Sequence, residues 1–225
     1  MLSSKKINTK KMTVMAMLCA FAFICVLLFR FEVGGFLTFD IKDAVLTVAS
    51  LIYGPLAGFI CSSVVTFLEF ILISDTGIYG FIMNFLSSVT FSVVAGLIYK
   101  YRRSMLGAVM GVVLAALSTT AVMLLSNLFI TPLFLGIDRG EVIKMLGGLL
   151  LPFNVIKAVF NGSLVLIIYK PFTMTLRKAK LLINESNHNY KFGFKSILLL
   201  VIAVTVLICA VLFLVLKMGG TVDLF

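Results

Sequence analysis

The sequence predicts an all-α protein whose helices cross a membrane several times. Of its 225 residues, 61% are hydrophobic and only 12% are charged, and the mean hydropathy is +1.18. A soluble domain is typically about 25% charged, so this chain has more apolar surface than one water-exposed fold would bury. The apolar residues also form long runs separated by polar, mostly basic stretches, which is the pattern of a polytopic membrane protein.

Seven apolar runs are expected to be helices, and the first six form a bundle. They cover 12–29, 44–53, 56–73, 81–99, 105–129, 149–169 and 196–216. The second run is short and could begin as early as Leu37, and Gly54 and Pro55 end it because they break helices. A further short helix is expected from Glu141 onward.

The polar stretches divide the chain into four parts. We expect a basic N-terminus at 1–11, a six-helix membrane domain at 12–172, a cytoplasmic linker at 173–195, and an additional C-terminal helix with its tail at 196–225.

The basic residues predict the orientation of the bundle. With the N-terminus in the cytoplasm, thirteen of the nineteen lysines and arginines lie inside and five lie outside, Lys42 among them; the last, Lys157, is within a span. Positive residues favour the cytoplasmic side. This count places the protein in the cell membrane and puts the loops 30–43, 74–80 and 130–148 outside. Because the basic residues flank membrane spans, we expect no nucleic-acid binding.

The segment 151–161, LPFNVIKAVFN, places polar side chains inside an apolar run. An unpaired Lys157 there would cost about 2.5–3.5 kcal/mol or more, so it needs an acidic partner or a ligand. Asp40 in the first outer loop and Glu69 in the third span are the candidate partners. Both interpretations stay open at this stage: a structural ion pair, or recognition of a ligand acceptor by Lys157 and Asn154.

Asparagines at one depth point to a ligand pocket. Asn84, Asn127 and Asn154 all fall in the outer half of three different spans, together with Asp40. One such asparagine usually hydrogen-bonds to a neighbouring helix, but three at matched depth favour a cavity open to the outside. Asn161 lies deeper and is expected to serve packing. Glu69 and Lys157 also leave open an alternative, a proton-coupled secondary transporter.

Several chemistries are excluded by missing motifs. The sequence has no phosphate-binding GxxxxGK[ST] loop, no HExxH and no serine in a GxSxG context, and its one histidine lies in the linker. An enzyme is therefore not expected, and no metal or cofactor site is either. Any energy for uphill uptake would have to come from partner proteins.

The segments described above resemble the substrate-binding S components of energy-coupling factor (ECF) vitamin transporters, most closely the riboflavin-specific members. The resemblance covers about residues 10–172. It is carried by the Ala16-xxx-Ala20 pair, FLTFDIKD at 36–43, YGPLAG at 53–58, GFIMNF at 80–85, NLFITPLFLG at 127–136 and LPFNVIK at 151–157.

The resemblance implies a fold, a ligand and partners. It implies a six-helix bundle that captures riboflavin, as transported ligand, in an outward-facing pocket capped by the first outer loop. Ala16 and Ala20 would dock on the family's transmembrane T subunit, and two ABC-type ATPases would drive uptake. The implied substrate-binding residues are Leu37, Phe39, Asp40, Asn84, Asn127, Asn154 and Lys157. Another vitamin or small heterocycle remains the alternative ligand.

Overall fold

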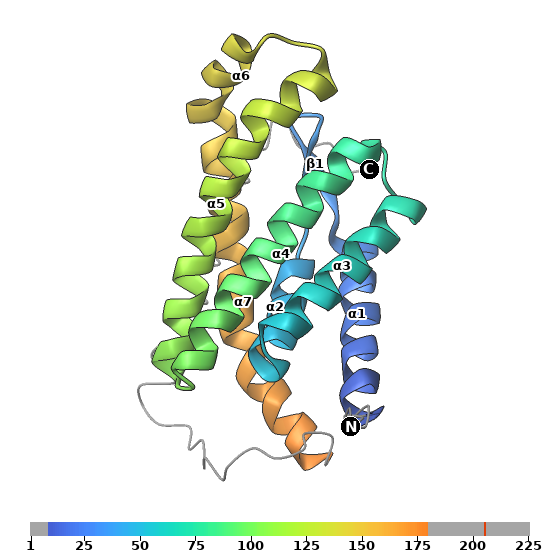
Figure 1. Cartoon of the computed structure of the whole chain (residues 1–225), viewed down its shortest axis with the longest axis vertical. Coiled ribbons are helices and arrows are strands. Elements are labelled where there is room, and N and C mark those ends of the chain that lie inside the picture. Colours follow the sequence, from blue (N-terminus) through green and yellow to red (C-terminus); the bar gives the residue numbers. More distant parts are fainter. Residues whose placement is uncertain (1–8, 180–204, 206–225) are drawn as a thin grey trace, which may run out of the picture.

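Long helices running side by side form most of the structure (Figure 1). The computed structural model describes residues 9–179 and residue 205. Its elements in chain order are α1 Thr9–Phe29, β1 Phe31–Val33, β2 Leu37–Phe39, α2 Lys42–Tyr53, α3 Pro55–Leu72, α4 Gly77–Tyr101, α5 Met105–Leu135, α6 Arg139–Met145, a π-helical turn Leu146–Leu150, and α7 Leu151–Lys178.

Five helical segments in the described part of the chain are long and apolar enough to cross a membrane. They are α1, α3, α4, α5 and the segment from Arg139 to Leu176. This confirms the predicted polytopic membrane bundle. Two helices extend further than expected, since α5 continues through Pro132 to Leu135 and α7 continues to Lys178, into the predicted linker. The predicted seventh span lies outside the described residues.

The second apolar run forms a short central helix, α2. Its twelve residues give a length of about 18 Å, less than the ~30 Å of a bilayer core. The residues from Lys42 to Leu51 are all buried, and α2 packs against α1, α3, α4 and α7. Gly54, with φ of 93°, and Pro55 at the first position of α3 then turn the chain into the next helix. The charged start of α2 is therefore enclosed by the bundle.

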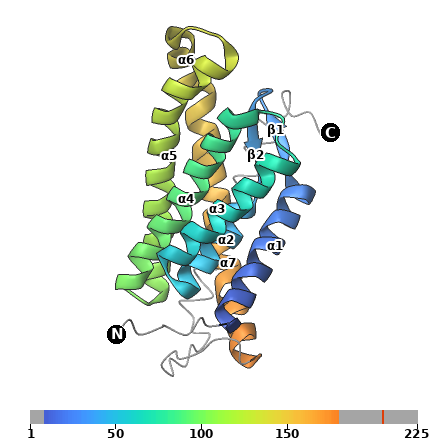
Figure 2. The same cartoon turned by 45° about the vertical axis from the view of Figure 1, so that its right-hand side comes forward.

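A β-hairpin precedes α2 where the sequence allowed an early helix start. β1 and β2 are antiparallel, with Phe31 opposite Phe39 and Val33 opposite Leu37. Gly34 and Gly35 make the turn with φ of 64° and 78°, values that glycine adopts without strain. A helix beginning at Leu37 is thus wrong. Figure 2 shows the hairpin toward the end of the bundle where α6 lies.

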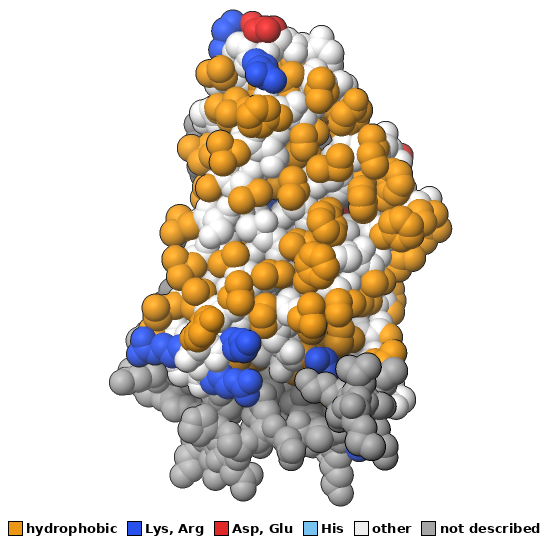
Figure 3. Space-filling model, viewed as in Figure 1, with side chains coloured by type: hydrophobic (Ala, Val, Ile, Leu, Met, Phe, Trp, Pro, Cys, Tyr) orange, Lys and Arg blue, Asp and Glu red, His pale blue; other side chains and the backbone are white. Residues whose placement is uncertain are grey.

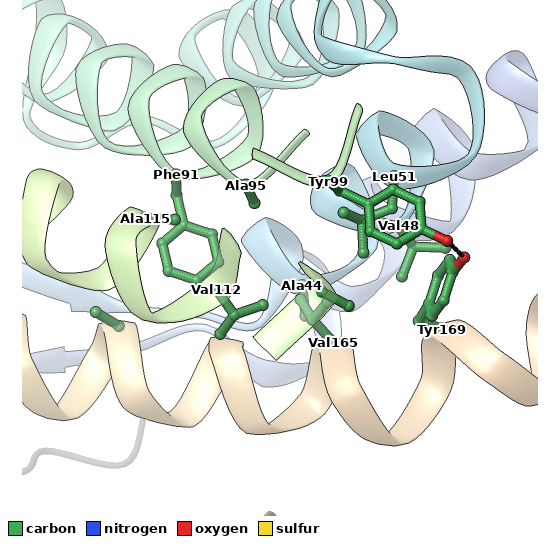
Figure 4. Packing of buried hydrophobic residues seen from close by; sticks show 12 residues of the cluster. Ala44, Val48, Leu51, Phe91, Ala95, Tyr99, Val112, Ala115, Val165 and Tyr169 are labelled. Carbon is green, nitrogen blue, oxygen red and sulfur yellow. Dashed lines mark hydrogen bonds between the residues drawn. The ribbon is translucent and has the colours of Figure 1, made fainter. Parts of the chain in front are cut away.

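Small side chains let α4, α5 and α7 pack closely around α2. The buried cluster in Figure 4 joins Phe91 and Ala95 of α4 to Val112 of α5 and Val165 of α7. A Cβ added at Gly111 would lie 2.8 Å from the carbonyl oxygen of Ala95, so these two backbones approach each other too closely for a larger residue. At one end of the cluster the hydroxyls of Tyr99 and Tyr169 hydrogen-bond to each other.

The exterior carries apolar side chains over most of its height (Figure 3). Exposed residues such as Phe21, Leu28, Phe67 and Leu117 cover α1, α3 and α5, as lipid contact requires. Charged side chains gather at the two ends of this face. Basic residues without acidic ones mark the end that holds the α4–α5 connection, whereas both signs occur at the α6 end.

Candidate functional site

A cavity opens between the hairpin and the ends of three helices. It has an empty volume of about 640 Å³, counted to its open mouth. Its walls come from the hairpin with Leu37 and Thr38, the start of α4, the end of α5 and the first turns of α7. The cavity therefore lies in the half of the bundle nearest α6 (Figure 1).

Four of the polar residues predicted from the sequence line this cavity. They are Asn84 of α4, Asn127 of α5, and Asn154 and Lys157 of α7. The three spans thus bring their polar groups together, as their matched depth led us to expect. Leu37, also among the predicted site residues, lines the same cavity.

The asparagines retain hydrogen-bonding groups for a ligand. Asn127 donates to the carbonyl of Met123 and accepts from Thr131, both at 2.7 Å, which leaves one N–H. Asn154 donates to the carbonyl of Leu150 at 2.7 Å and keeps one N–H and its oxygen. The side chain of Asn84 makes no hydrogen bond within residues 9–179. These bonds fix the orientation of two amides that line the cavity and leave hydrogen-bonding groups available to a ligand.

Lys157 is anchored at the back of the cavity by two hydrogen bonds. Its Nζ donates to the carbonyl oxygen of Thr38 at 2.9 Å and to Oδ2 of Asp40 at 2.8 Å. An ammonium has three donors, so one N–H remains. The two interpretations left open by the sequence therefore hold together in the geometry: Lys157 is ion-paired, and it also lines the cavity.

Asp40 lies behind the cavity wall instead of lining it. Its side chain is 1% exposed and its Oδ2 contacts both Lys157 and Lys42, the latter at 3.0 Å. Lys42 in turn donates to Oε1 of Glu69 at 3.2 Å and lies 3.1 Å from Oε2. Glu69 is thus not the partner of Lys157. Four buried ionic groups alternate in sign, in the order Glu69, Lys42, Asp40 and Lys157.

The burial of Lys42 corrects the count of outer charges made from the sequence. Its side chain is 1% exposed, and the first turn of α2 holds it inside the bundle. Its position beside the acidic residues of FLTFDIKD suggested a loop, because the sequence does not show where the hairpin ends. Sequence reasoning therefore missed Lys42 as the ionic partner of Asp40 and Glu69. The available signal was that Asp40 and Lys42, of opposite charge, are only two residues apart.

Asn161 holds the start of α2 against α7. Its Nδ2 donates to the carbonyls of Asp40 and Lys157, at 3.0 and 3.1 Å, and its Oδ1 accepts from the backbone N–H of Ala44 at 3.0 Å. The last bond satisfies one of the free donors at a helix N-terminus. Asn161 therefore packs at depth as expected, and it also fixes the segment that carries Asp40.

Aromatic side chains surround the cavity, but Phe39 is not among the lining residues. Phe36, Tyr79, Phe134 and Phe153 contribute rings to the wall. Phe39 is 2% exposed and stacks on Phe31 with 4.9 Å between ring centroids. It also meets Phe153 and Phe160 edge-on. Phe39 thus supports the wall from behind.

A smaller recess continues from the back of the cavity. It has an empty volume of about 230 Å³ and shares Ser87, Asn154 and Lys157 with the main cavity. Asp43 lines it and accepts a hydrogen bond from Ser88 at 2.5 Å. The hydroxyl of Thr119, buried in this recess, has no hydrogen-bond partner within residues 9–179. The recess is therefore polar on several sides.

The predicted docking residues Ala16 and Ala20 lie on the outside of the bundle. Both are exposed on α1, whereas the buried face of this helix carries Val14, Leu18 and Ala22. Packing within the described bundle therefore does not account for this pair. A second helix could approach α1 closely here, since small residues leave room for its backbone.

The fold and the cavity define a polytopic membrane protein that binds a small molecule. A family model described as the substrate-specific component of ECF transporters matches residues 10–169. This chain belongs to that family, whose members are transporter components and not enzymes. The resemblance inferred from its motifs is confirmed.

Relatives and a solved structure agree with this assignment. The chain is 27% identical to the riboflavin transporter RibU of Staphylococcus aureus (strain TCH60), over 77% of this chain and 97% of the relative. It is 29% identical to the riboflavin transporter FmnP of Bacillus subtilis (strain 168), over 76% and 98%. A structure described as the S component of a bacterial ECF transporter matches with a TM-score of 0.66 and 27% identity, over 76% of this chain and 99% of that one.

Proposed function

We propose that this protein is the riboflavin-binding subunit of an ECF-type importer. The observation that carries the proposal is the set of free hydrogen-bonding groups in the aromatic-lined cavity. Asn127, Asn154 and Lys157 each offer an N–H, and Asn154 adds an acceptor. The proposal also draws on the relatives, which are riboflavin transporters.

Riboflavin has the complementary chemistry. The polar end of its ring system carries two carbonyls and ring nitrogens as acceptors and one imide N–H as donor. A set of three N–H donors with one amide oxygen matches that edge. Its flat ring body would stack on or meet the edges of side chains such as Phe36, Tyr79 and Phe153. In this proposal Leu37 contacts the ring, while Asp40 and Phe39 support the wall.

The proposed orientation opens the cavity to the outside of the cell. The exposed basic residues Lys100, Arg102 and Arg103 join α4 to α5 at the end opposite α6. Positive residues favour the cytoplasmic side, so α1 begins in the cytoplasm and the hairpin faces outward. Moving Lys42 from the outer loop into the bundle makes the outer side less basic and strengthens this assignment.

The proposed partners are a transmembrane T subunit and two ABC-type ATPases. The exposed pair Ala16 and Ala20 is the proposed contact with the T subunit. Replacing both with leucine should reduce riboflavin uptake by cells that contain the whole transporter at least about tenfold, which corresponds to ~1.4 kcal/mol. The reason is that bulky side chains prevent a close helix approach.

The affinity of the purified double variant for riboflavin should not change, because α1 contributes nothing to the cavity. Ala121→Leu is the matched control, since Ala121 is exposed on α5, away from α1. Normal uptake by the Ala16→Leu/Ala20→Leu variant would rule out this docking surface.

Binding of riboflavin to the purified protein tests the proposal directly. Stacking on aromatic rings quenches flavin fluorescence, and the chain has no tryptophan whose emission would interfere. We expect a saturable loss of flavin emission at one site, with a flavin absorption band in protein purified from cells. If the protein binds no flavin at micromolar concentration but binds another vitamin, riboflavin is the wrong ligand, and the assignment to the family still stands.

A proton-coupled transporter using Glu69 and Lys157 has less support. These two side chains do not contact each other, because Lys42 and Asp40 separate them. Uptake in vesicles that contain this protein alone and follow a pH gradient would favour that function.

A further inference from the structure

We propose that Glu69 is a positioning residue for Lys157. By pairing with Lys42 it leaves the carboxylate of Asp40 available to Lys157, which then stays beside the cavity with one N–H left for a ligand. The proposal rests on the proposed function only for the last step, contact with the ligand. The ionic arrangement itself involves three helices and the β2–α2 corner, and its behaviour is measurable without any ligand.

The contacts run continuously from α3 to α7. Glu69 accepts from Lys42 at 3.2 Å, Lys42 donates to Oδ2 of Asp40 at 3.0 Å, and Lys157 donates to the same oxygen at 2.8 Å. Asp40 is also fixed by its other oxygen, which accepts from the backbone N–H of Lys42 at 3.2 Å. Glu69 does not line the main cavity, although it lines a smaller recess that shares Thr76 and Asn84 with that cavity. Its link to Lys157 passes through Lys42 and Asp40.

Two ammonium groups share one carboxylate oxygen of Asp40, and the negative charge of Glu69 balances the second ammonium. A buried charge without a partner is strongly unfavourable. With Glu69 ionised, Lys42 has a carboxylate of its own and leaves Oδ2 of Asp40 available to Lys157. Asp43 adds a third carboxylate near this cluster, but Ser88 donates to it and no ion pair joins it to either lysine within residues 9–179.

Removing the charge of Glu69 would therefore displace one lysine, and the structure identifies which. The side chain of Lys42 is 1% exposed and enclosed by α2 and its neighbours, whereas Lys157 is 10% exposed and borders the cavity. Lys157 is the one with room to move. In the Glu69→Gln variant, Lys42 would keep its ion pair with Asp40 and Lys157 would lose its own. The ammonium of Lys157 would then move into the cavity, away from the carbonyl of Thr38.

Chemical labelling of lysines tests this displacement without a ligand. Reductive methylation of the folded protein, followed by peptide mass spectrometry, reports how accessible each amine is. Glu69→Gln should raise the labelling rate of Lys157 about fivefold, while the exposed Lys144 labels equally in this variant and in the unmodified protein. Glu141→Gln is the matched control, because Glu141 pairs with Lys144 on the surface. An unchanged rate at Lys157 in folded Glu69→Gln protein would overturn the proposal.

A charge-compensated variant covers the case in which Glu69→Gln does not fold. Lys42→Gln/Glu69→Gln removes one charge of each sign and leaves Asp40 paired with Lys157 alone. This variant should fold and protect Lys157 as well as the unmodified protein does. Labelling of Lys157 as fast as that of a freely exposed lysine in the double variant would also overturn the proposal.

Riboflavin titrations of the same proteins separate this proposal from the proposed function. Glu69→Gln should weaken riboflavin binding about tenfold, and the compensated double variant should recover most of the loss. If riboflavin does not bind to the unmodified protein, the proposed ligand is wrong, and the labelling result still decides the positioning role. If Lys157 is displaced in the Glu69→Gln protein and riboflavin still binds with full affinity, then the position of Lys157 does not affect the ligand. The positioning role of Glu69 would stand in that case.

Discussion

Lys157→Met is expected to weaken riboflavin binding about 10- to 100-fold, since a hydrogen bond to a charged group contributes about 1.5–3 kcal/mol. Methionine retains most of the apolar stem of lysine but removes its ammonium and all three N–H donors. The fold should survive, because Asp40 keeps Lys42 as a partner. Flavin fluorescence titration of the purified variant measures the loss.

Lys144→Met provides the control for Lys157→Met. Lys144 is exposed on α6 and pairs with Glu141 at 2.7 Å, away from the cavity, so its removal should leave the affinity unchanged. Equal affinities of Lys157→Met and the unmodified protein would remove Lys157 from the ligand site. Loss of secondary structure in Lys157→Met would instead assign it a purely structural role.

Asp40→Asn is expected to destabilise the protein by about 3–5 kcal/mol, the cost of leaving a buried charge without its partner. The asparagine would keep an acceptor for the backbone N–H of Lys42, so the turn itself is preserved. The ammonium groups of Lys42 and Lys157 would then lose their shared carboxylate, and within residues 9–179 Lys157 has no other ion pair. Thermal unfolding in detergent, followed by circular dichroism, measures the effect.

Asp75→Asn is the matched control for Asp40→Asn. Asp75 also accepts from a basic residue, Arg30 at 3.3 Å, but its side chain is 79% exposed. Exposed ion pairs contribute about 0–1 kcal/mol, so this control should melt close to the unmodified protein. Similar melting of both variants would mean that the ionic cluster is solvated and not sealed inside the bundle.

The ionic cluster and the cavity depend on the same short helix. α2 is too short to cross the membrane, and its first turn brings Lys42 and Asp43 into the bundle. The hairpin before it covers the cavity with Leu37 and Thr38, and Asn161 fixes the corner between the two. A change at this corner therefore affects both stability and ligand contact.

The sequence alone was sufficient to predict the membrane bundle and several polar residues of the cavity wall. Long apolar runs predict spanning helices, because backbone polar groups in lipid must bond within the helix. The depth of Asn84, Asn127, Asn154 and Lys157 within those runs follows from counting residues, since a helix rises about 1.5 Å per residue. These four residues do line one cavity.

Only the tertiary structure decided how the charged residues pair. Asp40 and Lys42 are two residues apart in a segment that reads equally as loop, strand or helix start. Whether Lys42 faces solvent or the bundle depends on where β2 ends and α2 begins, a boundary that the packing of α7 and Asn161 fixes. The partner of Glu69 lies 27 residues away. Local sequence carries no signal for such a contact, because it arises from the way α2 packs among the helices around it.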